Sequence, residues 1–208
     1  MRLPIVSKSR RGRRRHKNWR YRNIASSDID TRLEVLISKE RLQQRIVELA
    51  QEIKRDYQDQ NPVLIGTLKG CFAFLTFLAL ELDFDIEIDF ISARSYGHSD
   101  RTSGRVDLFK NLSIDVRDRH VLLVEDIVDS GFTLRILLED FQLAKPKSVA
   151  VVALLNKRGS HHVEVPLKYV GFDIEDDFVV GFGLDFSEKY RNLPYIAVLK
   201  RMNMSSNQ

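Results

Sequence analysis

Three hydrophobic segments of strand length run directly into polar or glycine-containing residues. They are PVLIGTLKG (62–70), HVLLVEDIVDSG (120–131) and SVAVVALLNK (148–157). Runs that are apolar throughout, without alternation, are typical of strands in a parallel sheet that is covered on both faces. Helical patterns follow the first two of them. The chain is therefore expected to be an α/β protein with a mainly parallel, twisted sheet and helices on both faces.

Further elements are predicted around these strands. Residues 33–37 predict a short strand, after which Ser38 is placed to cap an amphipathic helix that ends before Asn61 and Pro62. The apolar residues of that helix recur at helical spacing, and a second, strongly apolar helix is expected over 71–82.

The second half of the chain predicts shorter elements. The alternating segment 86–93 predicts a strand, the glycine- and serine-containing segment 94–104 a loop, and 106–114 a weaker strand. The strand that starts at 120 is expected to end at Val124, followed by an acidic turn and a helix. Three short strands separated by polar turns are expected within 163–200.

Length and composition favour one folded domain. The chain has 208 residues, of which 43% are hydrophobic and 30% charged, so it can bury a core and is neither disordered throughout nor fibrous. No segment reaches the roughly 18 apolar residues that a membrane span needs, so no membrane contact is expected. The single cysteine, Cys71, cannot form an internal disulfide, and its apolar neighbours predict that it is buried.

The charge divides the chain in two. Residues 1–27 hold 10 of the 33 Lys and Arg residues and no acid, which leaves 23 basic against 29 acidic residues, or −6, in 28–208. We expect 1–27 to be a basic arm that is disordered in isolation, and 28–208 to be the folded domain. The arm has three open interpretations: a solvated tail, an RNA- or phosphate-binding extension in which Trp19 and Tyr21 stack, or an organellar targeting peptide.

The strongest chemical motif is VEDIVDSGFT, which begins at Val124 and follows a predicted strand. Backbone N–H groups around Ser130 and Gly131 at a helix N-terminus, together with hydroxyl groups, are typical of a phosphate site. Glu125 and Asp126 can bind sugar hydroxyls or a hydrated Mg²⁺, which prefers hard oxygen ligands. An ordinary capped helix start would explain one or two of these residues, but not three acids beside a glycine.

This string resembles the phosphoribosyl-pyrophosphate (PRPP) signature of type I phosphoribosyltransferases, specifically the hypoxanthine-guanine type. Other segments resemble that family in the expected order over about residues 30–200. They are Thr67 to Gly70, Arg94 to Gly97, Leu155 to Arg158, Asp177 to Gly181, Leu184-Asp185 and Tyr190-Arg191. The resemblance implies the type I phosphoribosyltransferase fold, with a small hood built from the C-terminal and N-terminal segments.

The resemblance also implies a purine-salvage transferase that uses Mg²⁺ to make IMP or GMP and pyrophosphate from PRPP and hypoxanthine or guanine. Asp129 occupies the place of the general acid/base at purine N7, which points to a 6-oxopurine. The other implied roles are ribose and 5′-phosphate binding by Glu125, Asp126, Asp129, Ser130, Gly131, Phe132 and Thr133; pyrophosphate binding by Lys69, Gly70 and Arg191; a lid at Ser95 and Tyr96; purine contacts by Lys157, Phe178, Val179 and Asp185; and Mg²⁺ ligation by Glu125, Asp126 and Asp185.

The family further implies a homodimer or homotetramer. The single cysteine fits a reducing compartment, so we expect a cytoplasmic location, with a mitochondrial one suggested by the arginine-rich, acid-free N-terminus. Two other functions stay open at this stage. In the first, the domain is a component of an RNA or ribonucleoprotein assembly to which the basic arm binds. In the second, the domain is a sensor that binds nucleotides in the same pocket. The sequence does not decide among hypoxanthine, guanine and xanthine.

Overall fold

The structure is a computed structural model that describes residues 31–92 and 112–201. Three predictions fall outside these residues. They concern the basic arm at 1–27 with its RNA-binding and targeting interpretations, the lid with Ser95 and Tyr96, and most of the weak strand at 106–114. The predicted boundary between an arm and a domain that begins at residue 28 also lies there, so it stays a prediction.

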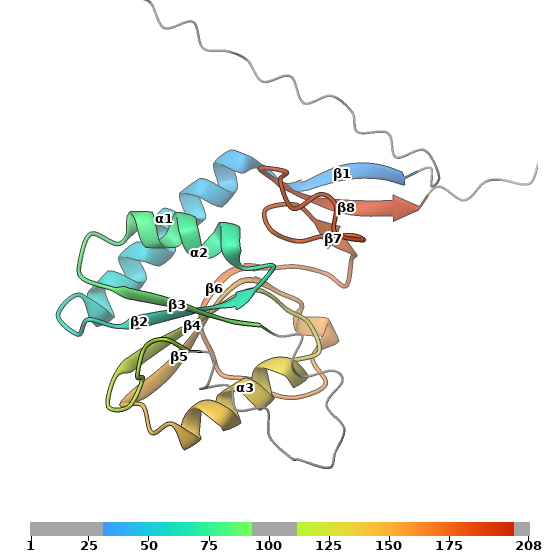
Figure 1. Cartoon of the computed structure of the whole chain (residues 1–208). Helices are drawn as coiled ribbons and strands as arrows, with labels where there is room; N and C mark the ends of the chain where they lie inside the picture. The colour runs from blue at the N-terminus through green and yellow to red at the C-terminus, as the bar shows by residue number, and fades with distance from the viewer. Residues whose placement is uncertain (1–30, 93–111, 202–208) are drawn as a thin grey trace, which may run out of the picture. The chain divides into compact units, whose positions relative to one another are not determined.

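A five-stranded parallel sheet forms the centre of the domain, in the order β3-β2-β4-β5-β6 (Figure 1). The inner strands β2, β4 and β5 are buried over most of their length because helices cover both faces, whereas the edge strands β3 and β6 are more exposed. The bounds are Val63–Leu68 for β2, Glu87–Ser92 for β3, His120–Val128 for β4, Ser148–Asn156 for β5 and Leu167–Asp173 for β6.

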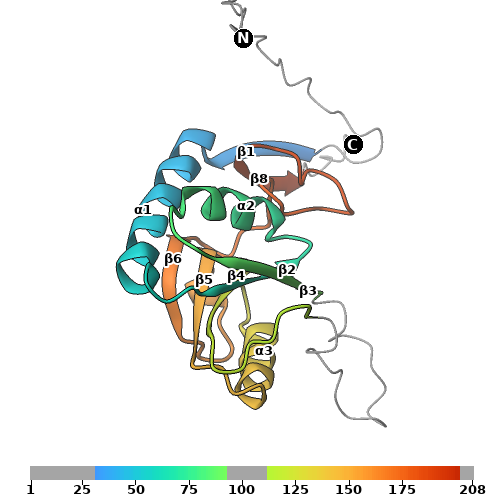
Figure 2. The same ribbon diagram turned by 60° about the vertical axis from the view of Figure 1, so that its left-hand side comes forward.

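Helices α1 (Lys39–Tyr57) and α2 (Phe72–Glu81) lie on one face of this sheet, and α3 (Phe132–Leu143) lies on the other (Figure 2). Successive residues of a strand point to opposite faces of the sheet. Leu122 of β4 belongs to the core beneath α1 and α2, whereas Leu123 belongs to the core against α3. The predicted α/β class and the covering of both faces are confirmed. A single 3₁₀ turn, Arg158–Ser160, follows β5.

A second, antiparallel sheet joins the two ends of the described chain. It has the order β1-β8-β7, where β1 is Thr31–Ile37, β7 is Val179–Val180 and β8 is Ile196–Arg201. Its residues Ile37 and Ile196 share the core of α1 and α2. The hood that the resemblance implied is therefore present, and the three C-terminal strands that the sequence predicted are β6, β7 and β8.

Strand β4 is longer than the sequence predicted. It does not end at Val124 but continues to Val128, because its pairing with β5 extends to Val128 and Asn156. The pairing with β2, by contrast, stops at Gly66 and Val124. The acidic residues after Val124 therefore lie in the strand and not in a turn, on a part of β4 that only one neighbouring strand supports.

The other local predictions agree with the structure, with one exception. The Ser38 side chain caps α1 by accepting a hydrogen bond from the backbone N–H of Arg41 at 3.3 Å. Cys71 is buried, and its surroundings raise the pKa of its thiol. Residues 112–114 form no strand, because the backbone N–H groups of Ser113 and Ile114 donate to the Asp89 carboxylate instead. Within the described residues, no helix combines the length and the apolar character that crossing a membrane requires.

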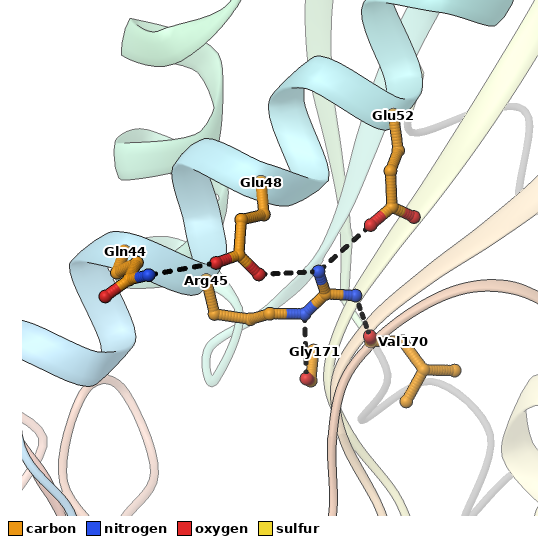
Figure 3. Close-up of polar contacts among 6 residues, drawn as sticks. All are labelled: Gln44, Arg45, Glu48, Glu52, Val170 and Gly171. Carbon is orange, nitrogen blue, oxygen red and sulfur yellow. Dashed lines mark hydrogen bonds and ion pairs between the residues drawn. The ribbon is translucent and has the colours of Figure 1, made fainter.

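Arg45 fastens α1 to the outermost strand β6 (Figure 3). Its guanidinium group donates to the carbonyl oxygens of Val170 at 2.9 Å and Gly171 at 3.1 Å. It also pairs with the carboxylates of Glu48 at 3.0 Å and Glu52 at 2.9 Å. The Arg45 side chain is only 24% exposed, so these charge-assisted hydrogen bonds are partly shielded from water.

Replacing Arg45 by alanine is expected to lower the free energy of unfolding by about 1–3 kcal/mol, because two partly buried carbonyls and two neighbouring carboxylates lose their partner. Urea denaturation followed by circular dichroism measures this change. Arg55→Ala on an exposed position of the same helix is the control, with an expected effect within about 0.5 kcal/mol. Equal effects of the two substitutions would contradict the role given to Arg45.

Candidate active site

The site residues gather at the carboxyl ends of β2 and β4. In the strand order, the chain runs from β2 outward to β3 at one edge of the sheet. From β4 it runs in the opposite direction, through β5 to β6 at the other edge. Such a reversal of strand order leaves a crevice beyond the strand ends, where α/β proteins bind ligands. Here the pairing of β2 with β4 ends at Gly66 and Val124, so the two strands part where Thr67 and Glu125 begin the site.

Glu125 and Asp126 form a pair of acids at this crevice. Glu125 is 7% exposed, and its Oε1 accepts a hydrogen bond from Thr67 Oγ1 at 2.7 Å. Burial and the charge of Asp126 raise the pKa of Glu125 to about 8, against the effect of Thr67. Burial also raises the pKa of Asp126 to about 6, although its own backbone N–H and that of Ile127 favour the ionised form. Ionising both carboxyl groups in this buried place is therefore unfavourable unless a cation binds beside them.

A cavity of about 110 Å³ lies between the end of β4 and the start of α3. At roughly 30 Å³ for each water molecule, it holds a group of a few heavy atoms. Gly131 precedes α3 with φ 83°, a left-handed conformation that glycine adopts without strain. The turn is fixed by the backbone N–H of His162, which donates to the Ser130 carbonyl at 3.0 Å. The cavity is lined by Glu125, Ile127, Val128, Asp129, Ser130, Gly131, Thr133 and Leu134.

Five of the seven residues predicted for ribose and phosphate binding thus line one cavity. Asp126 and Phe132 do not line it. Phe132 is 53% exposed, and its ring stacks on His162 with the ring centroids 5.9 Å apart. The Phe132 ring therefore contacts the neighbouring loop and does not line the cavity.

Lys157 connects the turn before α3 with the segment that leads to the hood. Its side chain is 9% exposed, and Nζ lies 3.5 Å from Asp129 Oδ2 and 3.1 Å from Asp176 Oδ1. Asp176 stands two residues before Phe178, whose ring is 53% exposed and meets Phe186 edge to face at 5.7 Å. The next residue, Val179, is buried in β7. Lys157 therefore supplies an ammonium group, and Phe178 supplies an exposed aromatic ring. The ion pair between Lys157 and Asp176 joins the two segments that carry them.

The loop between β2 and α2 lies against Asp126. A side chain at Gly70 would place its Cβ 1.6 Å from Asp126 Oδ2, so a larger residue there would force the Asp126 carboxylate to move. In the same loop, the peptide bond between Leu68 and Lys69 is cis. The hood lies against the same loop, since a Cβ at Gly183 would meet the Gly70 carbonyl oxygen at 2.0 Å.

The hood loop carries the remaining predicted residues. Arg191 Nη2 pairs with Asp185 Oδ1 at 2.7 Å, and Nη1 donates to the Gly183 carbonyl at 2.8 Å. The charges of Arg191 and Asp185 both act on Asp126 and shift its pKa in opposite directions. The hood, the β2–α2 loop and the end of β4 therefore meet around Asp126. Ser95 and Tyr96 lie outside the described residues.

Two residues of this neighbourhood, Asp176 and Glu188, had no predicted role, and Thr67 was predicted only as part of the motif 67–70. Thr67 stands in the motif 67–70 and binds Glu125, but a threonine at a strand end gives no sign of its partner. Asp176 and Glu188 belong to polar turns. Asp176 is 19 residues from its partner Lys157, and Glu188 is 119 residues from its partner Lys69, so the sequence gives no sign of these contacts. Only the fold brings these side chains to the lysines.

Comparison with known proteins identifies the family. The phosphoribosyl transferase domain family matches residues 36–187. A hypoxanthine-guanine phosphoribosyltransferase of Bacillus subtilis is 46% identical over 166 residues, which cover 80% of this chain and 92% of that protein. The hypoxanthine phosphoribosyltransferase of Escherichia coli is 43% identical, with 79% of this chain and 93% of that protein covered.

Solved structures give the same result. The crystal structure of a hypoxanthine-guanine phosphoribosyltransferase from Bacillus anthracis has a TM-score of 0.73 and 45% identity, covering 79% of this chain and 97% of that chain. A hypoxanthine phosphoribosyltransferase from Staphylococcus aureus has a TM-score of 0.74 and 39% identity, covering 83% and 92%. The extent of these likenesses shows that the chain belongs to the phosphoribosyltransferase family and, within it, to the hypoxanthine-guanine phosphoribosyltransferases.

Proposed function

We propose that this purine-salvage transferase converts hypoxanthine or guanine and PRPP, with Mg²⁺, into IMP or GMP and pyrophosphate. The bond from C1 of PRPP to the pyrophosphate oxygen breaks, a bond from C1 to purine N9 forms, and the purine loses a proton. The observation that carries the proposal is the cavity at the start of α3, where Glu125, Asp129, Ser130, Gly131 and Thr133 come together in a chain 46% identical to a hypoxanthine-guanine phosphoribosyltransferase.

The donor set suits Mg²⁺ provided that the substrate supplies further ligands. No group of three or more His, Cys, Asp or Glu side chains among the described residues is placed to hold a metal alone. Mg²⁺ commonly uses one or two carboxylates and completes its shell with water and phosphate oxygens. Glu125 and Asp126, whose pKa values are raised mainly by burial, would hold the ion on the ribose side, and Asp185 would hold one on the pyrophosphate side. When bound, the metal supplies charge compensation for the substrate oxygens.

The phosphate end of PRPP is assigned to the turn before α3. Backbone N–H groups at the helix N-terminus and the hydroxyls of Ser130 and Thr133 suit a 5′-phosphate in the cavity that these residues line. Glu125 and Asp126 are placed to accept hydrogen bonds from the ribose hydroxyls. Their charge also favours a ribose that becomes cationic as the bond at C1 breaks.

The purine is assigned to Lys157, Phe178 and the backbone near Val179 and Asp185. Lys157 donates to O6, and the exposed ring of Phe178 stacks on the base. Asp129, 3.5 Å from Lys157, exchanges a proton with N7 and thereby adjusts N9 as nucleophile or leaving group. Two further assignments, a lid at Ser95 and Tyr96 and a homodimer or homotetramer, rest mainly on the family. Exposed apolar side chains on α2, Phe77 and Leu80, support the oligomer.

Nucleotide formation from hypoxanthine or guanine, PRPP and Mg²⁺ tests the reaction, and Asp129→Asn tests the acid/base role. Asparagine keeps the size and an acceptor atom but cannot carry the proton, so kcat is expected to fall about 10²-fold or more with little change in PRPP affinity. Steady-state kinetics and calorimetric binding of PRPP measure the two effects. An unchanged kcat would refute the role of Asp129, and the exposed Asp59→Asn serves as control.

Glu125 gives a pH prediction. In the free protein it holds a proton below its raised pKa of about 8, whereas binding of Mg²⁺ and PRPP favours the carboxylate. Binding should therefore release a proton from Glu125, and affinity should rise up to about tenfold per pH unit between pH 6 and 8 and then level off. Calorimetry in buffers of different ionisation enthalpy counts the protons. Glu125→Gln cannot release this proton, so equal release by both proteins would contradict the assignment.

A further inference from the structure

Glu188 lies between the two basic residues assigned to pyrophosphate. One of its oxygens, Oε2, is 3.0 Å from Lys69 Nζ and 3.3 Å from Arg191 Nη2. Lys69 comes from the β2–α2 loop and Arg191 from the hood, so a single carboxylate oxygen bridges the two parts of the site. This is the arrangement that an oxygen of a bound phosphate group would make with the same two side chains.

The backbone holds Glu188 in this position. Ser187 and Glu188 have φ values of 51° and 62°, in the left-handed region that residues other than glycine rarely adopt. The Glu188 N–H donates to Asp185 Oδ2 at 2.8 Å, and Phe186 and Lys189 exchange two backbone hydrogen bonds. Such conformations persist only where surrounding contacts enforce them, and they are common at ligand sites. The turn therefore holds the Glu188 carboxylate beside Lys69 and Arg191, although its backbone conformation is unfavourable.

The charges favour the same interpretation. The Glu188 carboxylate forms ion pairs with both Lys69 and Arg191, so it places a negative charge between the two cations. Arg191 is also engaged by Asp185, so the added carboxylate leaves little positive charge free for a ligand. Glu188 is 51% exposed and Lys69 55% exposed, so water can reach their ion pair and an incoming anion can replace it.

We propose that the Glu188 carboxylate competes with pyrophosphate for Lys69 and Arg191. The inference rests on the proposed function, because that function assigns these two residues to pyrophosphate. Glu188 is a positioning residue that acts through its two partners. It must leave them when the pyrophosphate group of the substrate binds, and it returns to them as product pyrophosphate departs. The contact therefore weakens pyrophosphate binding and speeds its release.

Glu188→Gln tests the proposal, because glutamine keeps the length of the side chain but removes its charge. Calorimetry with pyrophosphate and Mg²⁺ is expected to give a dissociation constant about three- to tenfold lower than that of the unmodified chain. The KM for pyrophosphate in the reverse reaction should fall by a similar factor, and the KM for hypoxanthine in the forward reaction should stay unchanged. Glu188→Asp, whose shorter side chain cannot reach both partners, should show part of the effect.

The matched control is Glu139→Gln, which removes a half-exposed ion pair with Arg135 on α3, away from the site. A merely structural bridge predicts the opposite sign, so weaker or unchanged pyrophosphate binding by Glu188→Gln would overturn the proposal. Absence of pyrophosphate binding by the unmodified chain would overturn it as well. Nucleotide formation by the unmodified chain, measured in parallel, shows separately whether the proposed reaction itself fails.

Discussion

The parting of β2 from β4 is the constraint on which the site depends. Both strands continue beyond Gly66 and Val124, but they no longer pair with each other. Backbone and side-chain groups there need other partners, and Thr67 and Glu125 supply one such contact at 2.7 Å. The crevice concentrates acids away from water, which raises their pKa values and favours a cationic partner. The hood loop that carries Arg191 and the turn before α3 both lie beside these acids.

Much of this architecture could be predicted from local sequence. Apolar runs without alternation gave the parallel sheet, and Ser38 marked the start of α1 because its side chain can cap a helix. Most residues of the motif after Val124, all except Asp126 and Phe132, line one cavity because a strand, a glycine turn and a helix place consecutive residues together. The roles assigned to them stay proposals that rest on the family.

Contacts between distant segments could not be predicted in this way. The end of β4 was placed at Val124 because the acids that follow suggested a turn, whereas pairing with β5 keeps them in the strand. Asp176 and Glu188 were not singled out because their partners become neighbours only after folding. The same limit applies to Arg45, which a helical pattern marks only as a polar position.

Arg45 has a further consequence for the behaviour of the protein at high concentration. Strand β6 is the last strand of its sheet, and the edge of such a strand can template pairing with another chain. The carbonyl oxygens of Val170 and Gly171 already accept hydrogen bonds from Arg45, and α1 lies alongside (Figure 3). They are therefore less available to a foreign strand, so the contact that fastens the helix also protects the domain against edge-to-edge aggregation.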